Sequence, residues 1–166
     1  MKQAVYPGSF DPITRGHLDI IRRSAGVFDH LTVLLAINPE KTPNFTVEER
    51  LNMIRRVTQD LPNVSVDAHQ GLMVDYARDN GITAIVRGLR AVSDFENEFQ
   101  MALTNRKMYP EAETLFLTTS LENMYLSSSM VRDVARFGGN IRPFVPDEIV
   151  EEVAERLLLA KGEENR

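Results

Sequence analysis

The feature that most constrains the fold is the alternation of short apolar runs with amphipathic segments along the whole chain. The run Leu31–Ile37, LTVLLAI, is apolar on both faces, as expected of a strand buried in a parallel sheet. Segments with apolar residues at helical spacing lie between such runs. Strands are expected around 4–6, 31–37, 64–68, 82–86 and 115–117, and helices over 17–28, 46–60, 72–80, 92–108, 128–137 and 146–160.

This alternation predicts a parallel sheet covered on both faces and, with right-handed crossovers, doubly wound. We therefore expect an α/β fold, a Rossmann-like doubly wound five-stranded parallel sheet with helices on both faces and a C-terminal helix. The 166 residues predict a single domain, 1–166, in which 146–160 is the C-terminal helix and 161–166 a flexible tail. On the long helix, an inward-facing stripe is expected from Phe95, Phe99, Ala102 and Leu103. Ligands are expected at the carboxyl ends of the strands.

The composition excludes several classes of protein. The chain has no cysteine, which removes disulfides, iron–sulfur clusters and thiol nucleophiles and fits a reducing, cytoplasmic location. We expect no membrane span and no signal peptide, because long apolar runs are lacking. Three separated histidines do not suggest a structural zinc site. The net charge of −5 argues against a nucleic-acid partner, although most of it lies in 147–166, with 7 acidic and 3 basic residues.

The first loop that could carry chemistry is YPGSFDPITRGH, from Tyr6 to His17. Gly8 and Gly16 permit close approach of the backbone to a ligand. The start of the following helix favours an anion, and Thr14 and His17 face the same side there. A plain strand–turn–helix, with Thr14 as the cap and His17 partly buried, explains the same residues equally well.

Two further loops carry basic side chains at strand ends. Lys41 lies in a proline-rich loop after the second strand, where a lysine is ordinarily solvated. Arg87 and Arg90 flank a glycine and a leucine after the fourth strand. Their guanidinium groups can bind a phosphate with two hydrogen bonds, or they can pair with Asp94 or Glu98 of the next helix. The two interpretations are compatible.

Two more segments have a structural and a functional interpretation. The serine run 127–129 opens a helix, so one serine serves as its cap, and the hydroxyl and N–H groups can also hold a phosphate. Met73 follows Leu72 at the start of another helix, where such a pair ordinarily belongs to the core. His30 and His69 are expected to be surface or structural residues.

These motifs resemble one family in order and spacing. Thr14 to His17 resembles the T/H-x-G-H motif of the nucleotidyltransferase superfamily, and the longer string YPGSFDPITRGH is similar to that of bacterial phosphopantetheine adenylyltransferases. The string RGLR followed by AVSDFE resembles the same family, as does the serine run. The similarity extends from Tyr6 to about Pro146. The departures are Ser9, where threonine also occurs, Leu126 in place of isoleucine, and Gly71, where an acidic residue can occur.

The resemblance implies transfer of the adenylyl group of ATP to 4′-phosphopantetheine, giving dephospho-coenzyme A and pyrophosphate in the penultimate step of coenzyme A synthesis. It implies His17, Lys41 and Arg90 as catalytic residues. The implied nucleotide-binding residues are Ser9, Phe10, His17, Gly88, Leu89, Arg90, Glu98, Asn123, Met124, Tyr125, Leu126, Ser127, Ser128 and Ser129, and the implied substrate-binding residues are Ser9, Lys41, Met73 and Arg87. It further implies Mg²⁺ bound with ATP and without a protein-only metal site, a homohexamer, and feedback binding of coenzyme A.

A phosphate monoester is already an anionic nucleophile, so direct in-line attack needs no Ser–His or Cys–His pair. Two alternatives stay open. One is another nucleotidyltransferase of this superfamily, with nicotinamide mononucleotide or a phosphorylated alcohol such as glycerol phosphate as acceptor. The strings RGLR and YPGSFDP disfavour it. The other is a non-catalytic nucleotide-binding module on the same fold, which the presence of Thr14, His17, Lys41 and Arg90 together disfavours.

Overall fold

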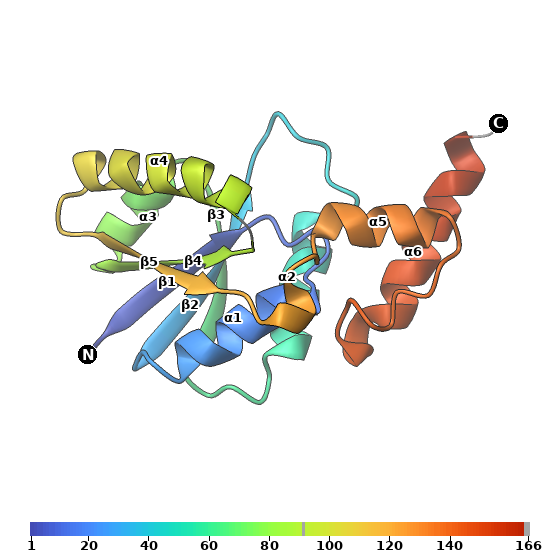
Figure 1. Cartoon of the computed structure of the whole chain (residues 1–166), viewed down its shortest axis with the longest axis horizontal. Coiled ribbons are helices and arrows are strands. Elements are labelled where there is room, and N and C mark those ends of the chain that lie inside the picture. Colours follow the sequence, from blue (N-terminus) through green and yellow to red (C-terminus); the bar gives the residue numbers. More distant parts are fainter. Residues whose placement is uncertain (91, 165–166) are drawn as a thin grey trace.

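The computed structural model describes residues 1–90 and 92–164. Its strands form one five-stranded sheet in the order β3-β2-β1-β4-β5, and each neighbouring pair is parallel (Figure 1). The strands are β1 (Gln3–Gly8), β2 (His30–Ile37), β3 (Val64–Gln70), β4 (Ala84–Leu89) and β5 (Glu113–Thr118). The helices are α1 (Arg15–Ala25), α2 (Val47–Val57), α3 (Met73–Asp79), α4 (Val92–Met108), α5 (Ser128–Arg136) and α6 (Val150–Glu164), with 3₁₀ turns η1 (Leu121–Asn123) and η2 (Asp147–Ile149). The predicted fold class is confirmed.

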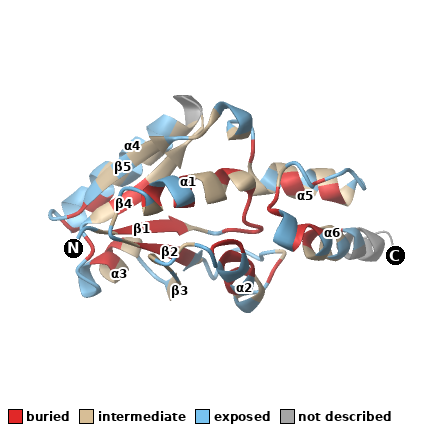
Figure 2. Ribbon diagram, turned by 90° about the horizontal axis from the view of Figure 1, so that it is seen from below, coloured by how far each residue is buried: buried red, intermediate tan, exposed pale blue. Residues whose placement is uncertain are grey.

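Alternate residues of the strands point into two separate apolar clusters. Ala4 and Tyr6 of β1 join the larger cluster with α1, α2, α5 and α6, whereas Val5 joins the smaller cluster with α3. Figure 2 shows β1 and β2 largely buried between α1 and α3. The sheet is thus covered on both faces. The strand order reverses between β1 and β4, and this is the point at which a doubly wound sheet opens a crevice for ligands.

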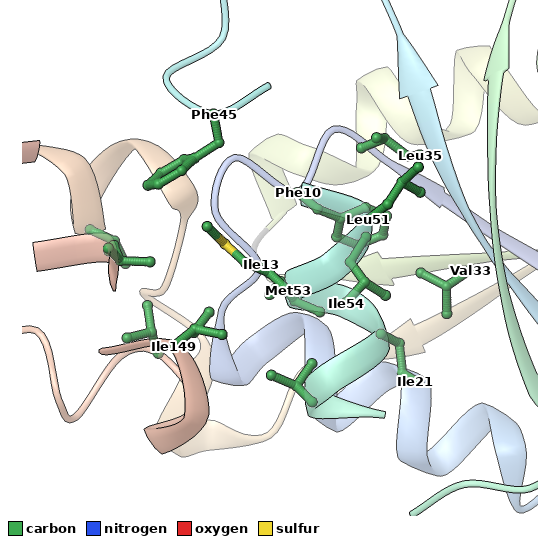
Figure 3. Packing of buried hydrophobic residues seen from close by; sticks show 14 of the residues in the cluster. Phe10, Ile13, Ile21, Val33, Leu35, Phe45, Leu51, Met53, Ile54 and Ile149 are labelled. Carbon is green, nitrogen blue, oxygen red and sulfur yellow. The ribbon is translucent and has the colours of Figure 1, made fainter. Parts of the chain in front are cut away.

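The larger cluster also holds the loop that follows β1. Phe10 and Ile13 of this loop are 2% and 0% exposed, and Figure 3 shows them beside Leu51 and Ile54 of α2. Burial of two large apolar side chains is worth roughly 1.5–3 kcal/mol each. The loop is therefore part of the core on one side, and its other side is left to line the site.

The capping box predicted for the second helix is present. The Thr46 hydroxyl accepts from the Glu49 backbone N–H at 3.2 Å, and the Glu49 carboxylate accepts from the Thr46 N–H at 2.8 Å. This exchange satisfies two backbone donors that a helix start otherwise leaves unpaired. It fixes where α2 begins, directly after the segment that carries Lys41.

Several predicted boundaries differ from those in the structure, and two of the differences concern the site and the C-terminus. The fourth strand extends beyond Val86, so Arg87, Gly88 and Leu89 lie within β4, because β5 continues the ladder as far as the Leu89–Thr118 pair. The last helix runs to Glu164, so that 161–164, expected as tail, are helical, while 165–166 lie outside the described residues.

The predicted inward stripe of the long helix is wrong. Phe95, Phe99 and Leu103 are 42%, 47% and 54% exposed. The helix packs over β4 and the edge strand β5, and Phe95 reaches the Phe116 ring of β5 at 6.0 Å. The less exposed positions among the described side chains of α4 are instead Asp94, Glu98, Ala102 and Asn105, spaced three or four residues apart. Of the predicted stripe only Ala102 lies on this face, and the aromatic stripe occupies a neighbouring, more exposed face. No described helix is long and apolar enough to cross a membrane.

Candidate active site

A cavity of about 460 Å³ lies at the carboxyl ends of β1 and β4. Its walls come from the β1–α1 loop, the first turns of α1 and α4, the end of β4 and the start of α5. Of the predicted site residues, the structure brings together Ser9, His17, Arg87, Gly88, Arg90, Glu98, Leu126, Ser127, Ser128 and Ser129 in this lining. Residues far apart in the sequence thus meet at the switch point of the sheet.

Thr14 and His17 form a reciprocal cap at the start of α1. The His17 backbone N–H donates to the Thr14 hydroxyl at 3.3 Å, and the Thr14 backbone N–H donates to Nδ1 of His17 at 3.0 Å. Nδ1 must therefore be unprotonated, so the neutral ring carries its proton on Nε2. The interpretation as a helix cap is confirmed, and because the cap uses only Nδ1, the other ring nitrogen stays available for a ligand.

The electrostatics keep this ring neutral. Burial, followed by the positive charges of Arg90 and Arg87, lowers the pKa of His17 to about 4. The ring edge-packs against Phe10 with centroids 5.1 Å apart. At neutral pH the side chain is thus an oriented hydrogen-bond donor rather than a cation.

Gly8 is required for this packing. A Cβ at this position would lie 2.9 Å from the Phe10 ring, closer than side chains normally approach. Phe10 itself has φ of 43°, a left-handed conformation that is uncommon outside glycine. Its ring lies beneath the site, in contact with His17 and Tyr6, and does not line the cavity described here. Phe10 therefore supports the site from the core side.

Arg87 is held by two hydrogen bonds to one carboxylate. Its Nε and Nη2 donate to the two oxygens of Glu98, each at 2.7 Å, and its Nη1 donates to the Pro7 carbonyl at 2.8 Å. Burial lowers the pKa of Arg87, but hydrogen bonding and charge attraction from Glu98 outweigh it and raise that pKa overall. The guanidinium is fixed in orientation, and the Glu98 carboxylate offsets much of its charge.

Arg90 reaches the cavity from just beyond β4. Its Nε donates to Asp94 at 3.1 Å and its Nη1 to the Leu126 carbonyl at 3.0 Å. Both ion pairs expected as a structural alternative therefore exist, Arg87 with Glu98 and Arg90 with Asp94. They coexist with the cavity, since all four side chains line it.

The three serines of the run, Ser127, Ser128 and Ser129, make different contacts. Ser127 caps α5 by accepting from the Met130 backbone N–H at 3.1 Å, and the Ser128 hydroxyl donates to the Pro12 carbonyl at 2.7 Å. Ser129 lines the cavity with them.

Arg132, one turn further along α5, also lines the cavity, although the sequence analysis did not predict it. Its spacing of four from Ser128 was the available signal, because residues four apart share a helix face.

Other lining residues were also missed. Asn97 and Thr119 line the cavity although neither belongs to a recognised motif. Thr119 donates to the Leu89 carbonyl at 2.6 Å, so it ends the β4–β5 ladder at the site. The sequence offered no signal for either residue, because each is placed by the register of the sheet and its crossover.

A second, shallower hollow of about 690 Å³ shares Arg90 and Thr119 with the first. It contains two of the predicted nucleotide-binding residues, Leu89 and Met124. Tyr125 is 61% exposed, and it and Asn123 lie outside both described linings. The predicted nucleotide-binding residues therefore fall mainly on two adjoining hollows.

Two predicted substrate-binding residues lie away from the cavity lining. Lys41 is exposed in the segment between β2 and α2. Met73 packs against the smaller apolar cluster, as its structural interpretation predicted.

In the described part of the chain, no group of three or more metal-ligating side chains gathers. The cavity carboxylates Asp94 and Glu98 are both bound by arginines.

The geometry and the comparisons together define the class. Residues 5–134 match the cytidylyltransferase-like family. A solved structure, a putative nicotinate-nucleotide adenylyltransferase from Vibrio parahaemolyticus, shares the fold with a TM-score of 0.66 at 18% identity, over 97% of this chain and 94% of that one. The chain is a nucleotidyltransferase with a Rossmann-like sheet.

Curated relatives show to which family of nucleotidyltransferases the chain belongs. A phosphopantetheine adenylyltransferase from Dictyoglomus turgidum is 55% identical over 156 residues, which are 94% of this chain and 98% of that protein. One from Desulforudis audaxviator is 59% identical over 146 residues, 88% of this chain and 90% of that protein. The chain belongs to the phosphopantetheine adenylyltransferase family.

Proposed function

We propose that this chain transfers the adenylyl group of ATP to the phosphate of 4′-phosphopantetheine. An oxygen of the acceptor phosphate forms a bond to the α-phosphorus, the bond from that phosphorus to the β-phosphate oxygen breaks, and pyrophosphate leaves. The observation that carries the proposal is that His17, Arg90 and the serine run line the same cavity at the β1/β4 switch point.

His17 supplies the donor for the charge that develops on the transferring phosphoryl group. Its Nδ1 is occupied by the Thr14 N–H, so the neutral ring presents Nε2–H. A donor that is already oriented costs no reorganisation during the reaction, and such donors are worth on the order of 10²-fold in rate. Because attack is direct, the ring does not need to accept a proton from the acceptor.

The arginines supply positive charge where two phosphate-bearing substrates meet. Arg90 and Arg132 both line the cavity, and their partners include the Leu126 and Asp11 carbonyls. Arg87, held by Glu98, presents a fixed guanidinium suited to an amide or phosphate of the acceptor. Catalysis on this view is positioning and charge stabilisation.

In this proposal the Lys41 side chain moves to the substrates after they bind. It is exposed, and its segment follows the carboxyl end of β2, the strand that pairs with β1. We propose that it folds over the bound phosphates and contacts both the acceptor phosphate and the reacting group. An ammonium on a long flexible side chain suits such a role, because it can approach after both substrates have bound.

Mg²⁺ is proposed to arrive with ATP. The donor set fits a metal held by phosphates and water, since Asp94 and Glu98 are both engaged by arginines. The ion would neutralise part of the triphosphate charge. Cytoplasmic location, which the cysteine-free composition favours, is part of the same proposal.

We also propose a homohexamer and feedback binding of coenzyme A in the same cavity. The exposed apolar side chains of α4 and β5 support assembly of copies: Phe95, Phe99, Met101, Leu103, Met108 and Leu115. Apolar patches of this kind commonly mark interfaces. Coenzyme A shares the pantetheine and adenylyl parts with the substrates and product, which is the basis for competition.

The proposed function is tested with purified protein, ATP, Mg²⁺ and a panel of acceptors. Pyrophosphate and dephospho-coenzyme A should form in equal, catalytic amounts with 4′-phosphopantetheine. Nicotinamide mononucleotide and glycerol phosphate should support far slower release. Preference for either of these acceptors would contradict the assignment, and stoichiometric pyrophosphate release would indicate a binding module instead.

A further inference from the structure

The segment between β2 and α2 is held at one end by a buried carboxylate of the β1–α1 loop. Asp11 is 8% exposed. Its Oδ2 accepts from the Asn44 backbone N–H at 2.9 Å and from the Asn44 side-chain amide at 3.2 Å, and its Oδ1 accepts from the Phe45 N–H at 3.0 Å. Hydrogen bonds to a carboxylate are among the stronger ones in proteins. One side chain thus ties down two consecutive backbone amides.

Asn44 is also held from the other side. Arg136 of α5 donates to its side-chain oxygen at 3.3 Å, and Arg156 of α6 donates to its carbonyl at 3.2 Å. The next residue, Phe45, is 1% exposed and packs beneath the Arg156 guanidinium at 5.5 Å. The distal end of the segment is therefore fixed by the first loop and by both C-terminal helices.

Asp11 is at the same time connected to the cavity. Its carbonyl accepts from Arg132, which lines the cavity, at 2.7 Å. The neighbouring Ser9 carbonyl accepts from the buried Arg50 of α2 at 2.9 Å. The β1–α1 loop, which leads into the helix start that carries His17, and the distal end of the β2–α2 segment thus form one connected unit.

The proximal part of the same segment is different. Residues 38–43 are all exposed, and Lys41 lies only three positions before Asn44. Three residues span at most about 10 Å, so the anchor at Asn44 limits the positions that Lys41 can reach. Without the anchor the stretch not held by the core would lengthen toward α2, and bringing Lys41 to the cavity would cost more entropy.

We propose that Asp11 is a positioning residue for Lys41, which fixes Asn44 and Phe45 to the first loop so that Lys41 closes over the bound phosphates. The inference rests on the proposed function of Lys41. Asp11 does not touch the substrates on this view: it lies outside the described cavity lining, and both its oxygens already accept from N–H donors.

The anchor is tested first without any substrate. Hydrogen exchange at the Asn44 and Phe45 amides is compared between the wild type and Asp11→Asn, which keeps the volume and loses one acceptor oxygen. Exchange at these two amides should rise at least tenfold, while the amides of β1 and β2 keep their protection. Unchanged exchange at 44 and 45 would overturn the anchor. Asp11→Ala serves as the stronger variant if it folds, as judged by its melting temperature.

The effect on Lys41 is tested by a double-mutant cycle on turnover. Asp11→Asn should lower kcat on the order of 10-fold in the wild-type background, with the KM for ATP changed less than twofold. In a Lys41→Ala background it should change kcat less than twofold. Equal losses in both backgrounds would show that Asp11 acts without Lys41 and would overturn the proposal.

The matched control is Asp60→Asn, since Asp60 is an exposed aspartate paired with Arg22 away from the site. It should leave kcat unchanged in both backgrounds, and a loss equal to that of Asp11→Asn would overturn the specific role. A wild type that releases no pyrophosphate would overturn the proposed function and the role of Lys41 together, whereas the exchange experiment would still decide whether the anchor exists.

Discussion

The backbone N–H of Thr14 donates a 3.0 Å hydrogen bond to Nδ1 of His17, and this bond decides what the histidine can do. The same pair closes the cap of α1 through the Thr14 hydroxyl. A helix start therefore sets the tautomer of the ring that we propose as catalytic. The same two residues cap α1 and orient the histidine ring. The effect of a substitution here on the stability of the fold and its effect on turnover are therefore measured separately.

Replacement of the ring should affect turnover far more than binding. We expect His17→Ala to lower kcat on the order of 10²-fold or more, because one oriented donor to the transition state is lost. The Kd for ATP, measured by calorimetry, should change by less than about 3-fold, since arginines and serines still line the cavity. His30→Ala is the control, because His30 contacts Ser65 on β3. A nearly unchanged kcat in His17→Ala would remove the role assigned to the ring.

The pH dependence of stability follows from the same side chain. Burial and the nearby charges of Arg90 and Arg87 lower the pKa of His17 to about 4, whereas it is 6.5 in an unfolded chain. Between these values the unfolded state binds more protons, so the free energy of unfolding must fall as the pH drops from about 6.5 to about 4. The loss is at most about 3 kcal/mol. Urea unfolding across this range should show a smaller pH dependence in His17→Gln, and an identical dependence would contradict the prediction.

Arg87 and Glu98 should behave as one unit. Removing either partner leaves a partly buried charge unpaired, so Arg87→Ala and Glu98→Gln should each destabilise the fold and raise the KM for 4′-phosphopantetheine. In a double-mutant cycle the two losses should be non-additive, with a coupling of roughly 1–3 kcal/mol. Glu113→Gln is the control, because its contact with Arg106 is long and exposed and should be worth under about 1 kcal/mol. Additive losses would mean that the pair is incidental.

The exposed stripe of α4 makes a prediction about assembly. Phe99→Lys and Leu103→Lys place charges at positions that are 47% and 54% exposed, so the fold of a single copy should survive. If these side chains form an interface, sedimentation should show smaller species than for the wild type. Val27→Lys is the control, since Val27 is 65% exposed on another part of the surface. Unchanged sedimentation of both α4 variants would place the interface elsewhere.

Much of the fold could be predicted because it depends on local patterns. The alternation of apolar runs and helical stripes determined the parallel sheet, and the Thr46 and Glu49 spacing determined one helix start. The glycines, Thr14 and His17 pointed to an anion site at the first loop. Each of these signals involves residues that are close in the sequence, and their physics is the geometry of a single strand, turn or helix.

The tertiary structure decided the rest. Which arginine pairs with which carboxylate, how far β4 extends, and whether Phe99 is covered all depend on the strand order and on what packs at the sheet edge. The anchor of Asn44 to Asp11 joins loops 33 residues apart. Such contacts leave no periodicity in the sequence, because they arise only when the crossovers bring the strand ends together. The sequence by itself thus determined the sheet and the class of site, and the folded chain decided which side chains hold the site in place.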